Sequence, residues 1–448
     1  FDPILDLFTP DIPDQPEQIT GNIVNKQASD NALPVIYGER QVGGTRVFVA
    51  SENAGENKNK YLYIALAICE GEITSIRDIQ VDDKPLLELD SSAVLLDNDA
   101  TTIPNNVTCY QIFKGTPDQA ASTLLMETEE WTAEHRLAGV TYIAWRFYWD
   151  EDKYRSVPTV KMIVKGRPVR NSFSINDAPQ WSDNPAHCLL DYLTNNVYGK
   201  GLSDAAIDMA SFRYAAAACN ETVQEYEGTD VSIPLLTCNA ILNSGNTLFD
   251  NVKTLLAGMR GMMPFVDGRY SLYIDKELPS DYPYFDLTPE NTSVDLQIVS
   301  TGKKEIFNKV TAKFTNPETN WQQDFAIWPE RGSEEEAAYL AEDGGEVMST
   351  EINLPSVTNF YRARDLAHIV CLNSRVSTFT AAVTGMSECL DIAVGDVVRY
   401  EQPSMGWTNE GGNDARQLFR VTNIQIMNTG EVELQLTRYS GQIYIWWD

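Results

Sequence analysis

The stretch Trp181–Leu202 constrains its local fold more strongly than any other part of the chain. Asn184 can cap a helix, because its side-chain oxygen can accept a hydrogen bond from a backbone N–H of the first turn. Pro185 then occupies the first helical position, where the missing N–H costs nothing. Apolar residues recur at i, i+3, i+4 and i+7, namely Ala186, Leu189, Leu190 and Leu193. We therefore expect a helix with one buried face, ended by Gly199 and Gly201, because glycine tolerates the left-handed backbone of a helix exit.

The length and composition are those of a multidomain globular protein. A chain of 448 residues exceeds one compact core and predicts two to four domains. Apolar residues make up 43% and charged residues 22%, which is typical of globular chains. No run approaches the roughly 18 apolar residues that a membrane-spanning helix needs, so we expect no membrane span.

The chain is strongly acidic, with 64 acidic against 34 basic residues and a formal net charge of −30. Affinity for nucleic acid comes largely from Lys and Arg side chains that neutralise phosphates, so this balance argues against a DNA-binding surface. Two interpretations stay open. The charge keeps the protein soluble, or it forms a wall past which DNA moves without adhering, because like charges repel.

No pattern indicates catalysis, a cofactor or a metal site. The cysteines are widely spaced without a CxxC pair, so we expect reduced, buried thiols at Cys69, Cys109, Cys188, Cys219, Cys238, Cys371 and Cys389. The histidines lack metal-site spacing and are His135, His187 and His368. Although His187 and Cys188 are neighbours, adjacent helical residues point about 100° apart and cannot pair as base and nucleophile. Asp97-Asn98-Asp99 lacks the later glycine and glutamate of a calcium loop, which favours a solvated turn.

Composition shifts predict an α+β fold dominated by β-structure, in four segments. Residues 1–30 carry four early prolines, which disfavour helix, so we expect an extended arm. Residues 31–172 hold β-branched and aromatic runs of a first β-rich domain, with an insertion near residues 85–140. Residues 173–292 are expected to form a helical, α+β domain, and residues 293–448 return to strands in a second β-rich domain.

Some local elements are predicted within these segments. A short helix is expected at residues 118–126, and Ser203 is expected to cap the second helix of the helical domain. The buried face of that second helix is expected to hold Ile207, Ala210, Tyr214 and Ala218. Asp267-Gly268 favours a hairpin turn. A shift of the apolar phase in the last hairpin predicts a bulge near Thr422.

Apolar residues near both ends of the chain are candidates for contacts with another subunit or protein. In the arm they are Ile4, Leu5, Leu7 and Phe8, for which a floppy terminus is the alternative. Near the other end they are Tyr444, Trp446 and Trp447. Such amphipathic aromatics favour interfaces, but they can equally complete the core of the last strand.

Trp181–Leu202 also closely resembles a motif of the tail hub proteins of long-tailed bacteriophages, the tail tip attachment protein J family with its lambda-type member. Further segments resemble later blocks of that family in the same order, namely Thr237–Pro279, Lys303–Trp321, Ser356–Arg375 and Leu390–Tyr400. The resemblance covers about half of the chain well. In the first 170 residues only Ala32–Phe48 looks similar.

This resemblance implies a structural baseplate hub protein of the phage tail tip and not an enzyme. It implies two small tube-like β-barrels per subunit, so that a homotrimer forms a pseudo-sixfold ring that continues the tail tube and closes its end. Three copies carry about −90 formal charges. The implied partners are the distal tail protein, the tail tube proteins, the tape-measure protein and the central tail fibre. DNA passes through this conduit during ejection without being bound.

The resemblance places the protein at the tail tip of the virion, after assembly in the cytoplasm of the bacterial host. Two other functions stay open on the sequence, a tail-associated hydrolase of the cell envelope and a receptor-binding tail protein. The family's fibre modules either follow residue 448 in a longer chain or belong to a separate protein.

Overall fold

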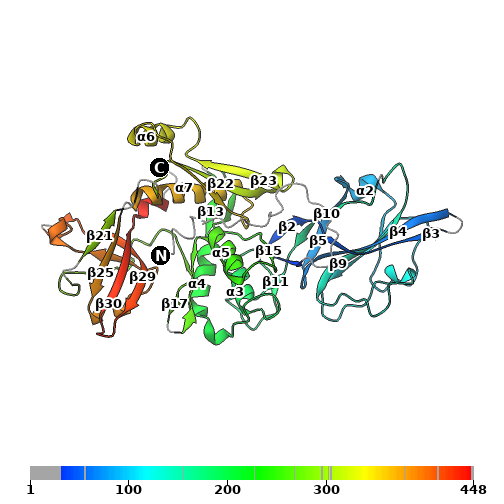
Figure 1. Cartoon of the computed structure of the whole chain (residues 1–448), viewed down its shortest axis with the longest axis horizontal. Coiled ribbons are helices and arrows are strands. Elements are labelled where there is room, and N and C mark those ends of the chain that lie inside the picture. Colours follow the sequence, from blue (N-terminus) through cyan, green and yellow to red (C-terminus); the bar gives the residue numbers. More distant parts are fainter. Residues whose placement is uncertain are drawn as a thin grey trace.

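The computed structural model describes residues 32–444, apart from 55–56, 155, 227, 267, 294–295, 301, 303–304, 378 and 411–412. The described chain is elongated (Figure 1). Two packed sheets lie at one end, a six-stranded sheet lies at the other, and helices lie between them beside a three-stranded sheet. Among the described helices, none combines the length and apolarity that a membrane crossing requires.

Two sheets form a β-sandwich at the start of the described chain. The five-stranded sheet has the order β3-β4-β9-β8-β7, with strands Thr45–Ala54 (β3), Asn57–Glu70 (β4), Val140–Tyr148 (β9), Cys109–Lys114 (β8) and Val94–Leu95 (β7). The four-stranded sheet has the order β2-β10-β5-β6, with strands Glu39–Val42 (β2), Val160–Lys165 (β10), Ser75–Val81 (β5) and Lys84–Pro85 (β6), followed by the short helix α2 (Leu86–Leu89). Ile64, Trp145 and Phe147 are buried between the sheets.

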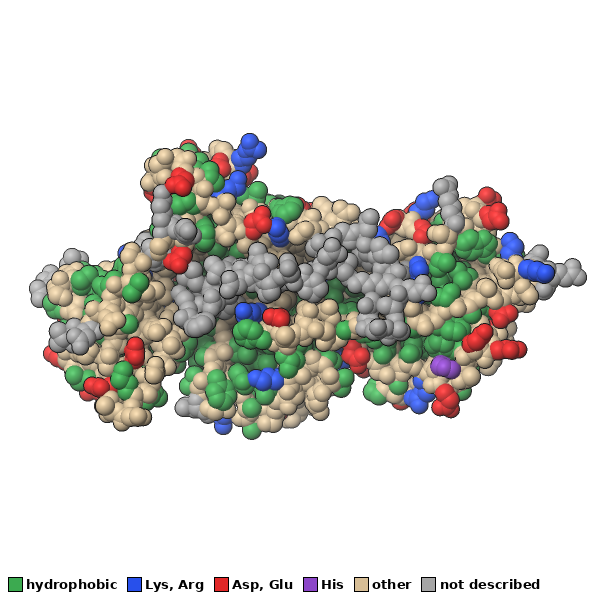
Figure 2. Space-filling model, viewed as in Figure 1, with side chains coloured by type: hydrophobic (Ala, Val, Ile, Leu, Met, Phe, Trp, Pro, Cys, Tyr) green, Lys and Arg blue, Asp and Glu red, His purple; other side chains and the backbone are tan. Residues whose placement is uncertain are grey.

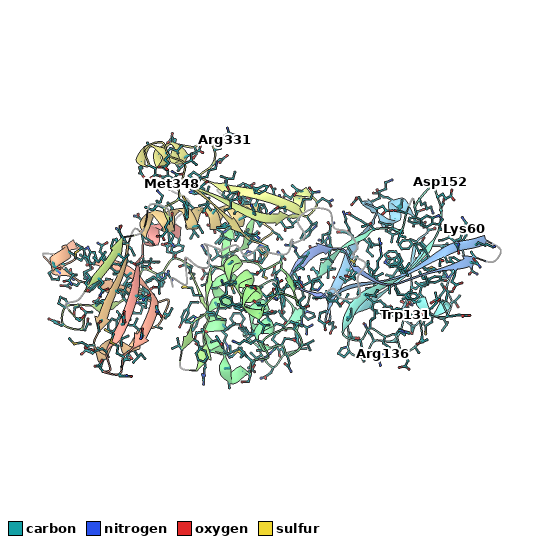
Figure 3. All side chains as sticks on the ribbon, in the orientation of Figure 1. Lys60, Trp131, Arg136, Asp152, Arg331 and Met348 are labelled. Atoms are coloured by element: carbon teal, nitrogen blue, oxygen red, sulfur yellow. The ribbon has the colours of Figure 1, made fainter. Side chains whose placement is uncertain are left out.

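The segment 115–139 covers the other face of the five-stranded sheet. Trp131 packs there against Phe48 and Tyr142, with ring centroids 5.2 and 6.4 Å away (Figure 3). The central strands of this sheet are therefore buried on both faces. A strand buried on both faces needs apolar residues at successive positions, which explains the nearly unbroken apolar run at Tyr61–Cys69.

The prediction of a helix at residues 118–126 is wrong, because this segment forms turns that lead to the 3₁₀ helix η1 (Leu125–Glu127). The Gln119 side-chain amide donates to the carbonyl oxygen of Leu137 at 2.5 Å. The hydroxyl of Ser122 accepts from the N–H that starts η1 at 3.1 Å. Such bonds between side chains and backbone compete with helical hydrogen bonds.

The central region combines helices with short strand pairs. Its helices are Pro185–Thr194 (α3), Asp204–Ala206 (η2), Met209–Cys219 (α4) and Leu248–Met259 (α5). Its strand pairs are Pro34–Ile36 with Ile241–Asn243 (β1, β15), Pro168–Val169 with Gln180–Trp181 (β11, β12), Thr222–Gln224 with Ser232–Pro234 (β13, β14), Gly261–Met262 with Tyr273–Ile274 (β16, β19) and Phe265–Val266 with Arg269–Tyr270 (β17, β18). The last pair confirms the predicted hairpin.

Helix α3 begins as predicted and ends earlier. The side chain of Asn184 accepts from the N–H of Ala186 at 3.0 Å, and Pro185 follows the cap. The helix stops at Thr194, so Gly199 and Gly201 shape the loop that follows it instead of ending it. Gly199 lies so close to the end of α3 that a Cβ would overlap a carbonyl oxygen of the helix.

Helix α4 begins later than predicted, and of the residues expected on its buried face it buries Ala218 but not Ala210 or Tyr214. The carboxylate of Asp208 accepts from the backbone N–H groups of Ala210 and Ser211 at 3.1 and 3.4 Å, whereas Ser203 makes no side-chain cap. Tyr214, which we expected in the core, is 79% exposed. The buried residues of this helix are Ser211, Phe212, Ala215, Ala216, Ala218 and Cys219.

After the central region, a three-stranded sheet and a long helix form a further small unit. The sheet has the order β23-β22-β24, with strands Gln322–Trp328 (β23), Lys309–Asn316 (β22) and Ser349–Asn353 (β24), and η4 (Pro317–Thr319) joins the first two. Helix α7 (Phe360–Val376) covers one face, and its buried residues include Ala363, Leu366, Ala367 and Val370, as predicted. In the sequence between β23 and β24, α6 (Glu334–Glu342) has no buried residue, and it projects from the molecule next to the labelled Arg331 and Met348 (Figure 3).

The six-stranded sheet has the order β20-β26-β29-β30-β25-β21. Its strands are Phe285–Leu287 (β20), Val397–Tyr400 (β26), Gln417–Ile426 (β29), Val432–Arg438 (β30), Phe379–Gly385 (β25) and Gln297–Ser300 (β21). Short elements beside it are Ser387–Asp391 (η5), Pro403–Met405 (η6), Asn409–Glu410 (β27), Asn413–Asp414 (β28) and Gly441–Tyr444 (η7). The register of β29 against β30 shifts at Thr422, which confirms the predicted bulge.

The predicted class, α+β dominated by β-structure, is confirmed. In the described part of the chain, neither of the two expected β-barrels is closed. The five-stranded sheet ends at β3 and β7, the six-stranded sheet ends at β20 and β21, and neither pair of outer strands meets. The boundaries of the four predicted segments stay predictions. The first β-rich segment also contributes to the core of the central helices, because Val35 and Tyr37 are buried there.

Candidate assembly surfaces and the central junction

The described residues contain no group of three or more His, Cys, Asp or Glu side chains that could hold a metal ion. His187 lies in α3 with Nε2 3.1 Å from the hydroxyl of Ser172 and Nδ1 3.4 Å from that of Ser182. The Cys188 thiol points to the carbonyl oxygen of Ser182 instead, at 3.7 Å. Burial raises the pKa of Cys188 and lowers the pKa of His187 to about 4. A thiolate–imidazolium pair needs the opposite shifts, so these neighbours are placed for packing.

The other sequence features with possible chemistry are also structural. All seven cysteines are buried and outside disulfides, as expected. Burial raises the pKa of the Cys69, Cys219 and Cys371 thiols to about 12. Asp97–Asp99 forms an exposed turn, which the N–H of Ala100 closes by donating to the carbonyl oxygen of Asp97 at 3.1 Å.

The three-stranded sheet presents apolar side chains on the face opposite α7. Phe325 and Ile327 of β23 are 48% and 36% exposed, whereas Ala326 between them is fully buried. Their neighbours across the strand pair are Lys313 and Thr311 of β22. Hydrophobic side chains are visible on the surface over this sheet in Figure 2. An exposed apolar pair on an edge strand is typical of a surface that another chain covers.

A second exposed edge lies at the far end of the sandwich. β3 forms the outer strand of the five-stranded sheet, and its residues Val47 and Val49 are 47% and 44% exposed. Its pairing with β4 shifts register at Phe48 and again near Ala54. Bulges of this kind twist an edge and weaken it as a template for further strand pairing.

A buried ion pair joins the six-stranded sheet to the central region. The guanidinium of Arg420 in β29 lies 2.6 Å from the carboxylate of Asp275, and the hydroxyl of Tyr444 in η7 donates to the same carboxylate. The Arg420 side chain is 9% exposed. Burial acts to lower the pKa of Arg420, but Asp275, Tyr444 and Tyr439 outweigh it, so the pKa is raised. The arginine is therefore charged inside the protein.

The junction continues from Asp275 into α5 and α7. The N–H of Asp275 donates to the carbonyl oxygen of Arg260, which ends α5 in a left-handed conformation with φ 51°. The Arg260 guanidinium lies 4.0 Å from the carboxylate of Asp365 in α7, and the Arg362 guanidinium lies 3.7 Å from it. Burial raises the pKa of Asp365, although both arginines act to lower it. Two groups of ion pairs, joined by this backbone hydrogen bond, thus connect α5, α7, β29 and η7.

The structure places one of the seven predicted contact residues. Tyr444 lies at this junction, where its hydroxyl donates to Asp275 of the same chain. Its contact with another subunit stays a prediction. Six of the residues lie outside the described residues, namely Ile4, Leu5, Leu7, Phe8, Trp446 and Trp447.

Neither the junction nor the exposed pair on β23 was predicted from the sequence. No local pattern links Asp275 with Arg420, because they lie far apart in the sequence. The shared face of Phe325 and Ile327 could have been predicted from the sequence. Their alternation with Ala326 and Trp328 places them on one face of a strand and the latter two on the other.

Comparison with known proteins gives relatives among phage tail proteins. The chain is 23% identical to "Baseplate hub protein pb3" of Escherichia phage T5, over 92% of this chain and 48% of that protein. It is 27% identical to "Tip attachment protein J" of Escherichia phage SECphi27, over 32% of this chain and 12% of that protein. The chain thus spans about half the length, or less, of these curated relatives. No family model matches the chain.

The fold has a counterpart in a solved structure. A chain of the "Virion of native gene transfer agent (GTA) particle" matches 96% of this chain with a TM-score of 0.61 and 15% identity, over 90% of its own length. The resemblance to tail hub proteins that the sequence motifs indicated is confirmed by the two phage relatives.

Proposed function

We propose that this relative of phage baseplate hub proteins is a structural protein of the tail tip that forms a homotrimeric ring. The ring continues the tail tube, closes its end, and opens as a conduit for DNA ejection into the host. The observation that carries the proposal is the similarity to a baseplate hub protein over 92% of the chain. The proposal assigns no catalytic step to the chain.

The positions of the β-rich ends support a closed ring. A cyclic trimer needs two different surfaces on each subunit, because a subunit contacts its two neighbours through different faces. In this elongated chain the sandwich and the six-stranded sheet lie at opposite ends (Figure 1). Contact of three copies end to end would arrange six β-rich units about one axis, which suits a sixfold tail tube.

The charge supports passage of DNA without binding. A net charge of −30 per subunit disfavours adhesion to phosphates, because adhesion depends on counterion release by Lys and Arg side chains. In this proposal the partners are the distal tail protein, the tail tube proteins, the tape-measure protein and the central tail fibre. The site of action is the tail tip of the virion, after assembly in the host cytoplasm. Ile4, Leu5, Leu7, Phe8, Tyr444, Trp446 and Trp447 are proposed to contribute contacts between subunits or with these partners.

Light scattering of the purified chain at rising concentration tests the ring. The expected mass is that of three copies, and the assembly is expected not to retain duplex DNA at low salt. Six copies, or a monomer at all concentrations, would contradict the trimer. Release of fragments from peptidoglycan or surface polysaccharide would instead favour a hydrolase, and direct binding of the isolated chain to host cells would favour a receptor-binding protein.

A further inference from the structure

Strand β23 is a long and regular edge strand. Natural edge strands usually carry bulges, charged residues or prolines, or are very short, and these features prevent pairing with other chains. β23 pairs with β22 through seven consecutive positions without a register shift and contains neither Lys nor Pro, and its one charged residue, Asp324, accepts from the N–H of Phe325 at 2.8 Å. β3 is also long but carries two register shifts, and the outer strands β7, β20 and β21 have at most four residues.

The position beside β23 suits a strand with apolar residues on both sides. On the outer face, an added strand would lie next to Phe325 and Ile327, which are 48% and 36% exposed. On the inner face it would lie next to Trp328, whose ring centroid is 4.4 Å from that of His368 in α7. Strand addition to such an edge gains affinity from backbone hydrogen bonds and specificity from alternate side chains.

The N-terminal arm contains a segment of this kind. Residues 4–9 read ILDLFT and lie between Pro3 and Pro10, so all six can donate a backbone hydrogen bond. In an extended conformation Ile4, Asp6 and Phe8 would project to one side, and Leu5, Leu7 and Thr9 would project to the other. The uncharged side with Leu5 and Leu7 would suit the inner face beside β23, and the side that carries Asp6 would suit the outer face, which solvent reaches.

The described chain comes near β23 at Arg40. The Arg40 guanidinium donates to the hydroxyl of Thr315 in β22 at 3.0 Å, and Thr315 is paired with Gln323 of β23. Residues 10–31, if extended, could reach about 70 Å at ~3.1 Å per residue. This reach exceeds the roughly 30 Å diameter of a small domain. The segment is therefore long enough to bring residues 4–9 to β23 of a neighbouring copy.

We propose that residues 4–9 of each subunit add as a strand to the free edge of β23 in the neighbouring subunit. This exchange of arms would tie the ring together without using the β-rich ends of the chain. The inference rests on the proposed trimer, so the mass of the assembly is measured first. A failure to trimerise is then distinguishable from a failure of the arm to dock.

A crosslinking experiment on the full chain tests the docking. Chains with Thr9→Cys are mixed with chains with Gln323→Cys, assembled, and treated with a short bis-maleimide, while the native cysteines stay unreactive because all seven are buried. A crosslinked dimer of the two chains is expected. Chains with Ser349→Cys, an exposed position on the opposite edge strand β24, serve as the matched control and are expected to crosslink at least tenfold less.

Amide exchange provides a second, independent measurement on the same assembly. In the trimer, β23 amides are expected to exchange at least tenfold faster when the arm carries Leu5→Asp and Leu7→Asp. A trimer without the Thr9–Gln323 crosslink would overturn the inference. A crosslink found only within one chain that carries both cysteines would overturn it as well, because the arm would then dock on its own subunit. Unchanged β23 exchange in the arm variant would also overturn it.

Discussion

Replacing Arg420 by methionine should loosen the joint between the six-stranded sheet and the central region. Methionine keeps much of the side-chain volume and removes the charge that faces Asp275 at 2.6 Å. Loss of one partner of a buried ion pair costs about 3–5 kcal/mol, because the other charge stays buried without compensation. Asp275 is 20% exposed and keeps its hydrogen bond from Tyr444, so we expect the lower end, about 3 kcal/mol.

Hydrogen exchange of the β29 and β30 amides measures this loss where it occurs. A decrease of about 3 kcal/mol in the opening free energy corresponds to exchange on the order of 100-fold faster. Arg77→Met is the matched control, since the Arg77 side chain is 48% exposed and its pairs with Glu39 and Asp78 are on the surface. The control is expected to cost less than about 1 kcal/mol. If Arg420→Met accelerates exchange in β29 and β30 no more than the control does, the junction does not hold the sheet in place.

Further predictions concern the core of the central region and the sandwich. His187 has a pKa of about 4 in the folded protein against 6.5 for the exposed side chain, so stability that is present above pH 6.5 should fall by up to about 3 kcal/mol as the pH drops toward 4. Urea titrations over this range should show a flatter pH profile for His187→Gln, and parallel profiles would contradict the assignment. Gly199→Ala should lower the melting temperature, because a Cβ would overlap the carbonyl oxygen of Tyr192, and an unchanged melting temperature would refute the close approach. Glu127→Gln should leave the buried guanidinium of Arg146 without its carboxylate at 2.7 Å and expose residues 115–139 to limited proteolysis, whereas unchanged cleavage would show that the pair does not anchor this segment.

Elements whose signals are local were predictable from the sequence. The cap by Asn184, the apolar stripe of α7 and the bulge at Thr422 depend on residues within a few positions, and the structure has all three. The helix expected at residues 118–126 failed, because the side chains of Gln119 and Ser122 hydrogen-bond into the loop instead. Asp208 caps α4 instead of Ser203. Both residue types suit the N-cap position, and tertiary packing selects between them.

The candidate surfaces were less predictable than the helices. The junction joins Asp275, Arg420 and Tyr444 from distant parts of the sequence, and only the tertiary fold brings them together. The sequence also did not show that the large sheets stay open. Alternation of apolar residues indicates the two faces of a sheet, but it does not indicate whether its outer strands pair with each other. Sequence motifs carried the resemblance to tail hub proteins, although half of the chain contributed little to it.

A cryo-EM density map of isolated tail tips tests the central claim most directly. The expected map holds three copies of this chain in one ring, with both β-rich ends of each copy around a central bore. The lining of that bore is expected to be free of clustered lysine and arginine side chains. A single copy at the tip, a sixfold ring of this chain, or a bore lined with basic side chains would contradict the account.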